Sequence, residues 1–417
     1  MQMQLKQYKA TIENGLIIFL GTACIFFITI KGWIESFNLL DITTFVYLIY
    51  LSIGLLCIIN YKNFINYSSY LIRTNVKSID FLIVISLMIF LILQGSVNIY
   101  ALSFICLFVF ISSIVSSQEF NKDYRYVLFS VLFVSIITVI GIFIGVLENF
   151  LFESKFFHAN KFTNYPSPIS IKYHFSGFQF SYNYSAYIIM SGLGLTHLVL
   201  PYNSATTFLR FVFFVGLFLT QAKAAFLYIA IIVVMSIQNR VFIFFRTHLL
   251  VALLISYCIL CHFTFAASGA EINSEHYFRD IKLSISDINV YSTLFLWLKE
   301  IFIVYISSNN LSEVSVSGFQ SLSEGLEPHS MLLSSYLFGG IIFSILIFFK
   351  ILKVVYEFYL TTSPTDKYFL SLVMVFFIES IVWDAYDSPI FWIIMLFCPL
   401  YGLYKDKSNH YYSKKYK

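Results

Sequence analysis

A histidine with the chemistry of a proton acceptor stands directly before one of the long apolar runs of this chain. His329 lies in Leu326-Glu327-Pro328-His329-Ser330, and the run that follows contains Gly339-Gly340. An imidazole titrates near neutral pH, so it can accept a proton from a hydroxyl group. Exposed N–H groups at the beginning of a helix favour a phosphate beside it. An interfacial histidine that only caps or hydrogen-bonds its loop would give the same pattern.

A single lysine, Lys223, lies between two other apolar runs, in Leu219-Thr220-Gln221-Ala222-Lys223-Ala224. A cation with small neighbours at a membrane interface can contact a diphosphate with little steric obstruction. A lysine whose ammonium group merely extends towards the membrane surface is equally compatible with this position.

Other polar side chains gather in two stretches that interrupt the apolar pattern. The segment 172–186 is rich in aromatic and polar residues that can stack on or hydrogen-bond sugars, although an aromatic belt is expected at any membrane interface. Cations in these stretches can meet phosphate, or they can be ordinary loop charges. The candidate binding residues are Lys172, His174, Tyr182, Asn183 and Arg279, with Lys282 as a further cation.

One short motif fits a cofactor site only by its spacing. Cys258-Ile259-Leu260-Cys261-His262 has the spacing of a c-type haem attachment site. It lies within an apolar run, and neither a second axial ligand nor further zinc ligands are apparent. The chain also has no phosphate-binding glycine loop, dinucleotide fingerprint or serine-hydrolase elbow. We therefore expect no cofactor and no metal.

The composition indicates an integral membrane protein. Of 417 residues, 59% are hydrophobic and only 12% are charged, and the mean hydropathy is +0.80. A soluble globular protein carries roughly a quarter charged residues. The chain has no charge run or basic face, which excludes a disordered protein and a nucleic-acid-binding domain.

Long apolar runs predict an all-α fold, a polytopic transmembrane bundle that forms one integral membrane domain over residues 1–417. A helix needs ~20 apolar residues to cross the bilayer. The twelve candidate helices lie near residues 15–31, 39–60, 79–96, 98–116, 126–147, 185–201, 204–221, 222–239, 248–267, 330–349, 367–384 and 388–404.

Charge decides how the segment 204–239 is divided. It forms either one long helix or two short helices that meet at Gln221-Ala222-Lys223. Two helices with a cytoplasmic N-terminus place most of the 26 basic residues inside, as the positive-inside rule requires. A single helix would reverse the membrane orientation of every later segment and place most of the later basic residues outside. We therefore expect two helices, both termini in the cytoplasm, and an even number of crossings.

This topology leaves two long connections on the outer side, 148–184 and 268–329. Residues 294–305 of the second connection predict an amphipathic helix that lies in the membrane interface. Loops on a rigid scaffold are where chemistry tends to occur, so we expect the site on the outer face. The apolar cores contain few ionisable residues, chiefly Glu379 and His197, which argues against an ion-coupled transporter.

The order of several motifs resembles the family of O-antigen polymerases and O-antigen ligases. Residues 219–227 resemble the family's Thr-x-(Ser/Thr)-Arg-small-small hairpin. Glu327-Pro328-His329-Ser330 with Gly339-Gly340 is similar to its His-Asn motif, which follows the long periplasmic loop. Ser176-Gly177 with Asn183 and Ala186 is similar to its entry into a mid-chain helix. More weakly, the turn that contains Asp384 resembles a polar outer turn between the last two helices. The resemblance covers about residues 174–404.

The resemblance implies a GT-C-like, inverting, metal-independent glycosyltransferase of the bacterial inner membrane, with its active face in the periplasm. Its donor is an undecaprenyl-diphosphate-linked oligosaccharide, and its acceptor is a lipid-linked repeat unit or a lipid A-core sugar. Membrane lipids surround it, and a chain-length regulator protein is a possible partner. His329 and Lys223 take the catalytic positions, and Asp384 joins the binding residues.

Two departures from the family pattern favour a polymerase over a ligase. Lys223 stands where the family has arginine, and Ser330 stands where it has asparagine. Arginine binds a diphosphate through two parallel hydrogen bonds and lysine does not. Polymerases of this family vary more at these positions than ligases do. A non-enzymatic flippase or channel is the competing class, and it would require a polar path through the apolar cores.

Overall fold

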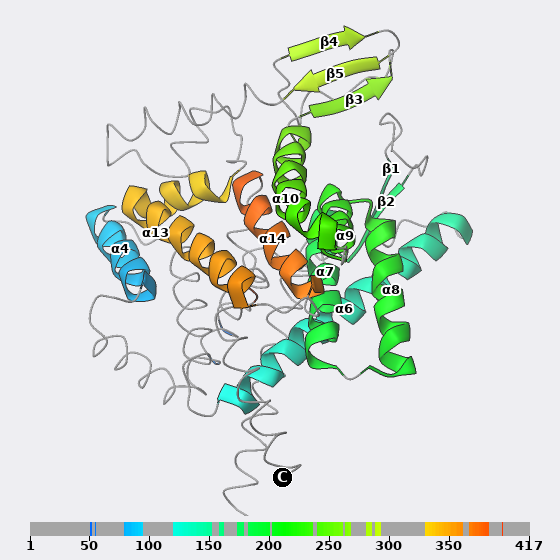
Figure 1. Ribbon diagram of the computed structural model, residues 1–417, viewed down its shortest axis with the longest axis horizontal. Helices are drawn as coiled ribbons and strands as arrows, with labels where there is room; N and C mark the ends of the chain where they lie inside the picture. Colours follow the sequence, from blue (N-terminus) through cyan, green and yellow to red (C-terminus); the bar gives the residue numbers. More distant parts are fainter. Residues whose placement is uncertain are drawn as a thin grey trace, which may run out of the picture.

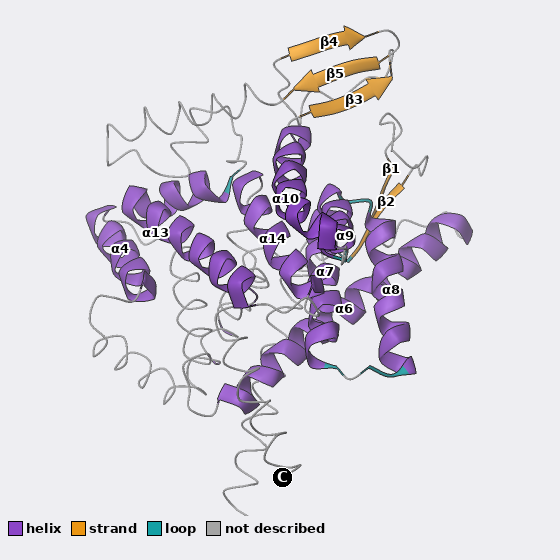
Figure 2. Cartoon of the chain, viewed as in Figure 1, coloured by secondary structure: helices purple, strands orange, loops and turns teal. Residues whose placement is uncertain are grey.

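The computed structural model describes fifteen parts of the chain, and they are mostly helical (Figures 1 and 2). These parts are consistent with the predicted all-α class, and they do not show the predicted bundle of twelve helices. The predicted helices 15–31, 39–60, 98–116 and 388–404 fall almost wholly outside them, as does the interfacial helix at 294–305. The described residues are 51, 55, 79–94, 120–151, 158–161, 173–178, 182–200, 202–236, 240–261, 263–267, 281–285, 288–292, 330–361, 367–382 and 394.

The helices of the described parts follow the predicted apolar runs, with shifted ends. They are α4 (Ile79–Gln94), α6 (Phe120–Leu151), α7 (Tyr182–Val199), α8 (Ser204–Thr220), α9 (Lys223–Met235), α10 (Arg240–Cys261), α13 (Met331–Thr361) and α14 (Lys367–Val382). The segment 204–239 contains two helices rather than one, as charge predicted. α13 is longer than the predicted 330–349 and kinks at Gly340, whose φ is 75° and ψ is 178°.

Two small antiparallel sheets lie in or beside the long connections. β1 (His158–Lys161) pairs with β2 (Tyr173–Gly177), and β5 (Ile288–Ser292) lies between β3 (Phe263–Ala267) and β4 (Ile281–Ile285). The predicted helix 248–267 is therefore wrong at its end, because α10 stops at Cys261 and β3 follows. Both sheets lie at the same end of the helical bundle (Figure 2), which we call the sheet end.

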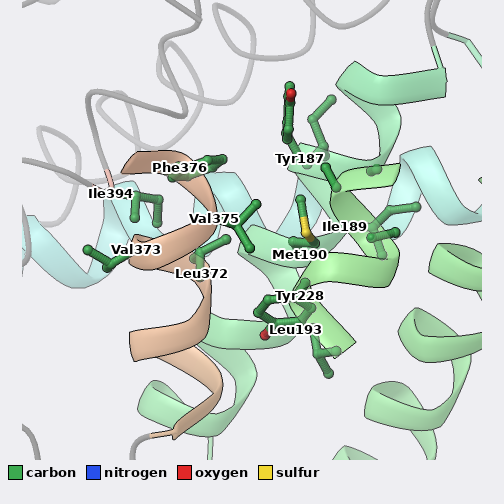
Figure 3. Close-up of a cluster of buried hydrophobic side chains, with 14 of the residues drawn as sticks. Tyr187, Ile189, Met190, Leu193, Tyr228, Leu372, Val373, Val375, Phe376 and Ile394 are labelled. Carbon is green, nitrogen blue, oxygen red and sulfur yellow. The ribbon is translucent and has the colours of Figure 1, made fainter. Parts of the chain in front are cut away.

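The centre of the bundle is α7, which contacts α6, α8, α9 and α14. Every residue from Ser185 to Thr196 is buried. Side chains of α7, α9 and α14 pack together here, including Met190, Tyr228 and Leu372 (Figure 3). Because α7 is surrounded on all sides, it is apolar around its whole circumference rather than along one stripe.

Contacts at both ends of α14 fix the directions of its neighbours. Tyr187 near the beginning of α7 contacts Glu379 near the end of α14, and His197 near the end of α7 stacks on Tyr368. α7 is therefore antiparallel to α14. Tyr257, near the end of α10, also contacts Glu379, so α10 is parallel to α14. α7, α9 and α13 begin at the sheet end, and α8, α10 and α14 end there (Figure 1).

Large apolar side chains are exposed on the outside of several described helices. On α8, Phe208, Phe211 and Phe214 are exposed, while Phe213 and Leu217 on the opposite face are buried. By length and composition, one helix of the described parts is sufficient to cross a membrane, over Val131–Glu148 of α6. α8, α9 and part of α10 are shorter apolar helices.

Candidate functional site

The junction of α8 and α9 at the sheet end is only two residues long. Gln221 ends α8 in the left-handed conformation, with φ 51° and ψ 23°, which a residue with a side chain adopts at a cost of about 1 kcal/mol. The Thr220 hydroxyl group donates to Leu217 O at 2.7 Å and accepts from Ala222 N at 3.3 Å. The side chain of Thr220 therefore stabilises the turn that glycine usually makes.

Lys223 is the first residue of α9 and is exposed, whereas the alanines around it are buried. Ala222, Ala224 and Ala225 pack into the bundle, and Ala222 gives α9 no side-chain cap. No hydrogen bond or ion pair joins Lys223 to another residue that the structure describes. The first turn of α9 thus combines a helix N-terminus without a side-chain cap and an exposed ammonium group, a combination that attracts an anion.

A buried carboxylate lies at the same end of the bundle. Glu379 of α14 is 4% exposed. The Tyr187 hydroxyl group of α7 donates to Glu379 Oε2 at 2.5 Å, and the Tyr257 hydroxyl group of α10 donates to Oε1. Burial disfavours the ionised form of this carboxyl group, whereas the two phenol hydrogen bonds favour it. Three helices therefore meet through one acidic side chain.

The packing of α9 against α14 brings Lys223 level with Glu379. At the opposite end Lys367 Nζ donates to the hydroxyl group of Ser236, the residue after α9, at 2.7 Å. Lys223 precedes Ser236 by 13 positions, and Glu379 follows Lys367 by 12. At 1.5 Å per residue, Lys223 lies about 20 Å along α9 from Ser236, and Glu379 lies about 18 Å along α14 from Lys367. Because the two helices are antiparallel, both residues lie at about the same height. The ammonium group of Lys223 accordingly acts electrostatically on the Glu379 carboxyl group.

The predicted aromatic segment also reaches this end of the bundle. Tyr182 and Asn183 occupy the first turn of α7 and are half-buried, and His174 belongs to β2. The Ser185 hydroxyl group donates to Ser176 O at 2.6 Å, which fastens β2 to α7. Tyr184 packs edge-on against Tyr187 with ring centroids 6.2 Å apart. The first turn of α7, to which β2 is fastened, thus lies next to Tyr187, one of the two tyrosines that contact Glu379.

Half of the predicted site residues lie outside the described parts of the chain. The next residue after the predicted histidine, Ser330, is buried and directly precedes α13. α13 begins at the sheet end, and so does α9 (Figure 1), whose first residue is Lys223. Among the described residues, no three histidine, cysteine, aspartate or glutamate side chains form a group that could hold a metal ion. The residues outside the described parts are Lys172, Arg279, His329 and Asp384.

A second polar layer joins the helices at the end opposite the sheets. The ring of His197 stacks on Tyr368 at 3.6 Å, and its Nδ1 lies 2.9 Å from the Tyr202 hydroxyl group. The Arg210 guanidinium group lies 4.2 Å from the centre of the Tyr202 ring and donates to Thr196 O at 2.8 Å, at the end of α7. This layer fastens α7, α8 and α14 together, so His197 has a structural role.

Sequence reasoning identified Lys223 but missed the tyrosines that hold Glu379. In the sequence, Glu379 is marked only as an ionisable residue in an apolar run. The signal that was available is the acid itself, because an ionisable side chain inside an apolar helix requires polar partners from other helices. Nothing in the sequence pattern selects Tyr187 and Tyr257 among the 30 tyrosines. The chain matches no protein-family model, and none of the curated proteins matches it.

Proposed function

We propose that the protein is a polymerase of a bacterial surface polysaccharide, a glycosyltransferase that takes its glycan from undecaprenyl diphosphate. The acceptor is a second lipid-linked repeat unit, and transfer occurs at the periplasmic face of the inner membrane. In this proposal the twelve predicted helices cross the membrane with both termini in the cytoplasm. The sheet end is the periplasmic end.

The observation that carries the proposal is the position of Lys223. It is an exposed cation without a hydrogen-bonding partner among the described residues, at the N-terminus of a helix whose neighbouring residues are small. A diphosphate needs such a combination of positive charge, backbone N–H groups and free space. The half-buried aromatic segment nearby offers faces on which sugars can stack.

The exposed apolar side chains support a membrane setting. Phe208, Phe211 and Phe214 on α8, and Ile341 and Ile342 on α13, face outward from the helices that they belong to. In water such surfaces would cost roughly 25 cal/mol for each Å², whereas lipid tails would cover them at no cost. These exposed apolar side chains therefore favour lipid over water as the surroundings of the helices.

The reaction transfers a sugar with inversion at its anomeric carbon. The acceptor hydroxyl oxygen forms the new bond to that carbon, and the bond from the carbon to the diphosphate oxygen breaks. The bonding electrons leave with the diphosphate, and Lys223 neutralises the charge that builds there, helped by Arg279 or Lys172. The hydroxyl proton passes to the imidazole of His329. No redox step is involved.

The position of Ser330, the residue after His329, supports the proposed role of that histidine. Ser330 directly precedes α13, and α13 begins at the end of the bundle where α9 begins. We therefore expect the imidazole of His329 at the same end of the molecule as the ammonium group of Lys223. Acid–base catalysis and leaving-group stabilisation can then act on one substrate.

Replacement of His329 with alanine tests the proposal. With the purified protein and an undecaprenyl-diphosphate oligosaccharide, we expect the rate of polymer formation to fall about 10²- to 10⁴-fold, the usual contribution of a general base. His410, near the C-terminus, provides a matched His→Ala control that is expected to keep its rate. Full activity in the His329→Ala protein would exclude the histidine from the reaction.

A knockout strain separates a polymerase from a ligase. Loss of the polymer with a single repeat unit still attached to the lipid A-core is the result expected of a polymerase. A bare core with accumulated lipid-linked polymer would instead identify a ligase. Long polymers that are made but not exported would favour the flippase alternative and contradict the enzymatic proposal.

A further inference from the structure

The reaction proposed above gives no role to Glu379, although its burial has a large cost. An ionised carboxylate that is removed from water is destabilised by several kcal/mol unless polar groups surround it. Glu379 is 4% exposed, and both of its oxygen atoms accept hydrogen bonds from tyrosine hydroxyl groups. Tyr187 and Tyr257 come from two different helices. Both phenols favour the ionised form of the carboxyl group against the cost of its burial, and they hold it in one place without adding a positive charge.

The carboxyl group of Glu379 lies level with the proposed diphosphate site. The helical rise counted from the contact between Lys367 and Ser236 puts Lys223 and Glu379 at about the same height on the packed, antiparallel helices α9 and α14. No ion pair within 4 Å joins them in the described parts of the chain. The lysine can therefore approach an anion, while the glutamate remains anchored behind it.

We propose that Glu379 is a positioning residue that acts through Lys223, as the fixed counter-charge of the diphosphate site. This inference rests on the proposed function. With the substrate absent, the pair of side chains is electrically neutral. With undecaprenyl diphosphate bound after transfer, the carboxylate repels the product and promotes its release, a step that limits many enzymes.

The role of Tyr187 and Tyr257 follows from this assignment. Each phenol stabilises the carboxylate by a hydrogen bond and keeps it from moving into direct contact with Lys223. If a second cation held Glu379 instead, the local charge would become positive and the diphosphate would bind more tightly. Neutral donors are thus the partners that a balanced site requires.

The Glu379→Gln protein tests this inference by the direction of its effect. Glutamine has nearly the same shape and can accept from one tyrosine and donate to the other. We expect undecaprenyl diphosphate to bind the full-length protein in phosphatidylcholine nanodiscs about tenfold more tightly, because a nearby negative charge is removed. Both kcat and KM for the lipid-linked donor are expected to fall, since product release becomes slower.

Three comparisons make the result interpretable. The Glu379→Asp protein keeps the charge and is expected to bind undecaprenyl diphosphate like the unaltered protein, and undecaprenol, which has no phosphate, should bind all variants equally. Unchanged or weaker diphosphate binding by Glu379→Gln would overturn the inference, because damage to the fold weakens binding and cannot strengthen it. If Lys223→Ala leaves diphosphate binding unchanged, the proposed function itself fails.

Discussion

Replacing Lys223 with alanine is expected to reduce kcat/KM for glycan transfer about 100-fold or more. One group that stabilises developing charge in a transition state contributes on that scale. Lys223 is exposed at the first position of α9, so its removal leaves the packing of the neighbouring alanines intact. Initial rates with purified protein and an undecaprenyl-diphosphate oligosaccharide measure the effect. The Lys223→Arg protein is expected to remain active, because the guanidinium group binds phosphate with two hydrogen bonds.

Lys367 provides a matched control in the same pair of helices. It lies at the opposite end of the bundle, where it donates to Ser236 at 2.7 Å. A charge at that distance from the sheet end does not contact the diphosphate, so Lys367→Ala is expected to keep most of its activity. Equal losses in Lys223→Ala and Lys367→Ala would show that the loss at Lys223 reflects net charge or folding.

The Gly192→Ala protein is expected to lose about 3 kcal/mol of its free energy of unfolding, at the upper end of the usual cost of overpacking. A Cβ atom added at Gly192 of α7 would lie 2.5 Å from Ser135 Cβ and 2.7 Å from Ser135 Oγ of α6. Ser135 cannot simply turn away, because its hydroxyl group donates to Ile188 O of α7 at 2.8 Å. The two helices must therefore separate. Unfolding by sodium dodecyl sulphate in mixed micelles measures the change.

Gly194, two positions after Gly192 in α7, is the control for this substitution. A Cβ atom added there would lie 3.2 Å from Leu372 Cδ2, the end of a flexible side chain. Alanine is also a better helix former than glycine by roughly 0.5–1 kcal/mol. Gly194→Ala is expected to leave the unfolding free energy unchanged or slightly higher. A similar loss at both positions would contradict the assigned packing of α6 against α7.

The helices were predictable wherever charge interrupted the apolar pattern. The division of 204–239 followed from the sidedness of basic residues, and the structure has α8 and α9 there. The end of α10 was not predictable in the same way. Phe263-Thr264-Phe265-Ala266-Ala267 continues the apolar run but forms β3. A short apolar run fits either a buried helix or a strand, and only pairing with β5 decides between them.

Of the candidate site, the exposed Lys223 was predictable from the sequence, and the buried contacts of Glu379 were not. Lys223 is marked by its position between two apolar runs, which is a local property of the sequence. The contacts of Glu379 with Tyr187 and Tyr257 join residues 192 and 122 positions apart. Such contacts depend on how α7, α10 and α14 pack together. A sequence pattern indicates that a buried acid needs partners, but it does not identify them.

Labelling of two single-cysteine proteins tests the central claim most directly, namely that Lys223 and His329 share the periplasmic end. The six native cysteines are replaced, and Lys223→Cys and His329→Cys are made singly and together. We predict that a membrane-impermeant maleimide labels both single variants from the outer side of intact spheroplasts. A short bis-maleimide should also link the two positions in the double variant. Labelling of the two cysteines from opposite sides of the membrane would contradict the account.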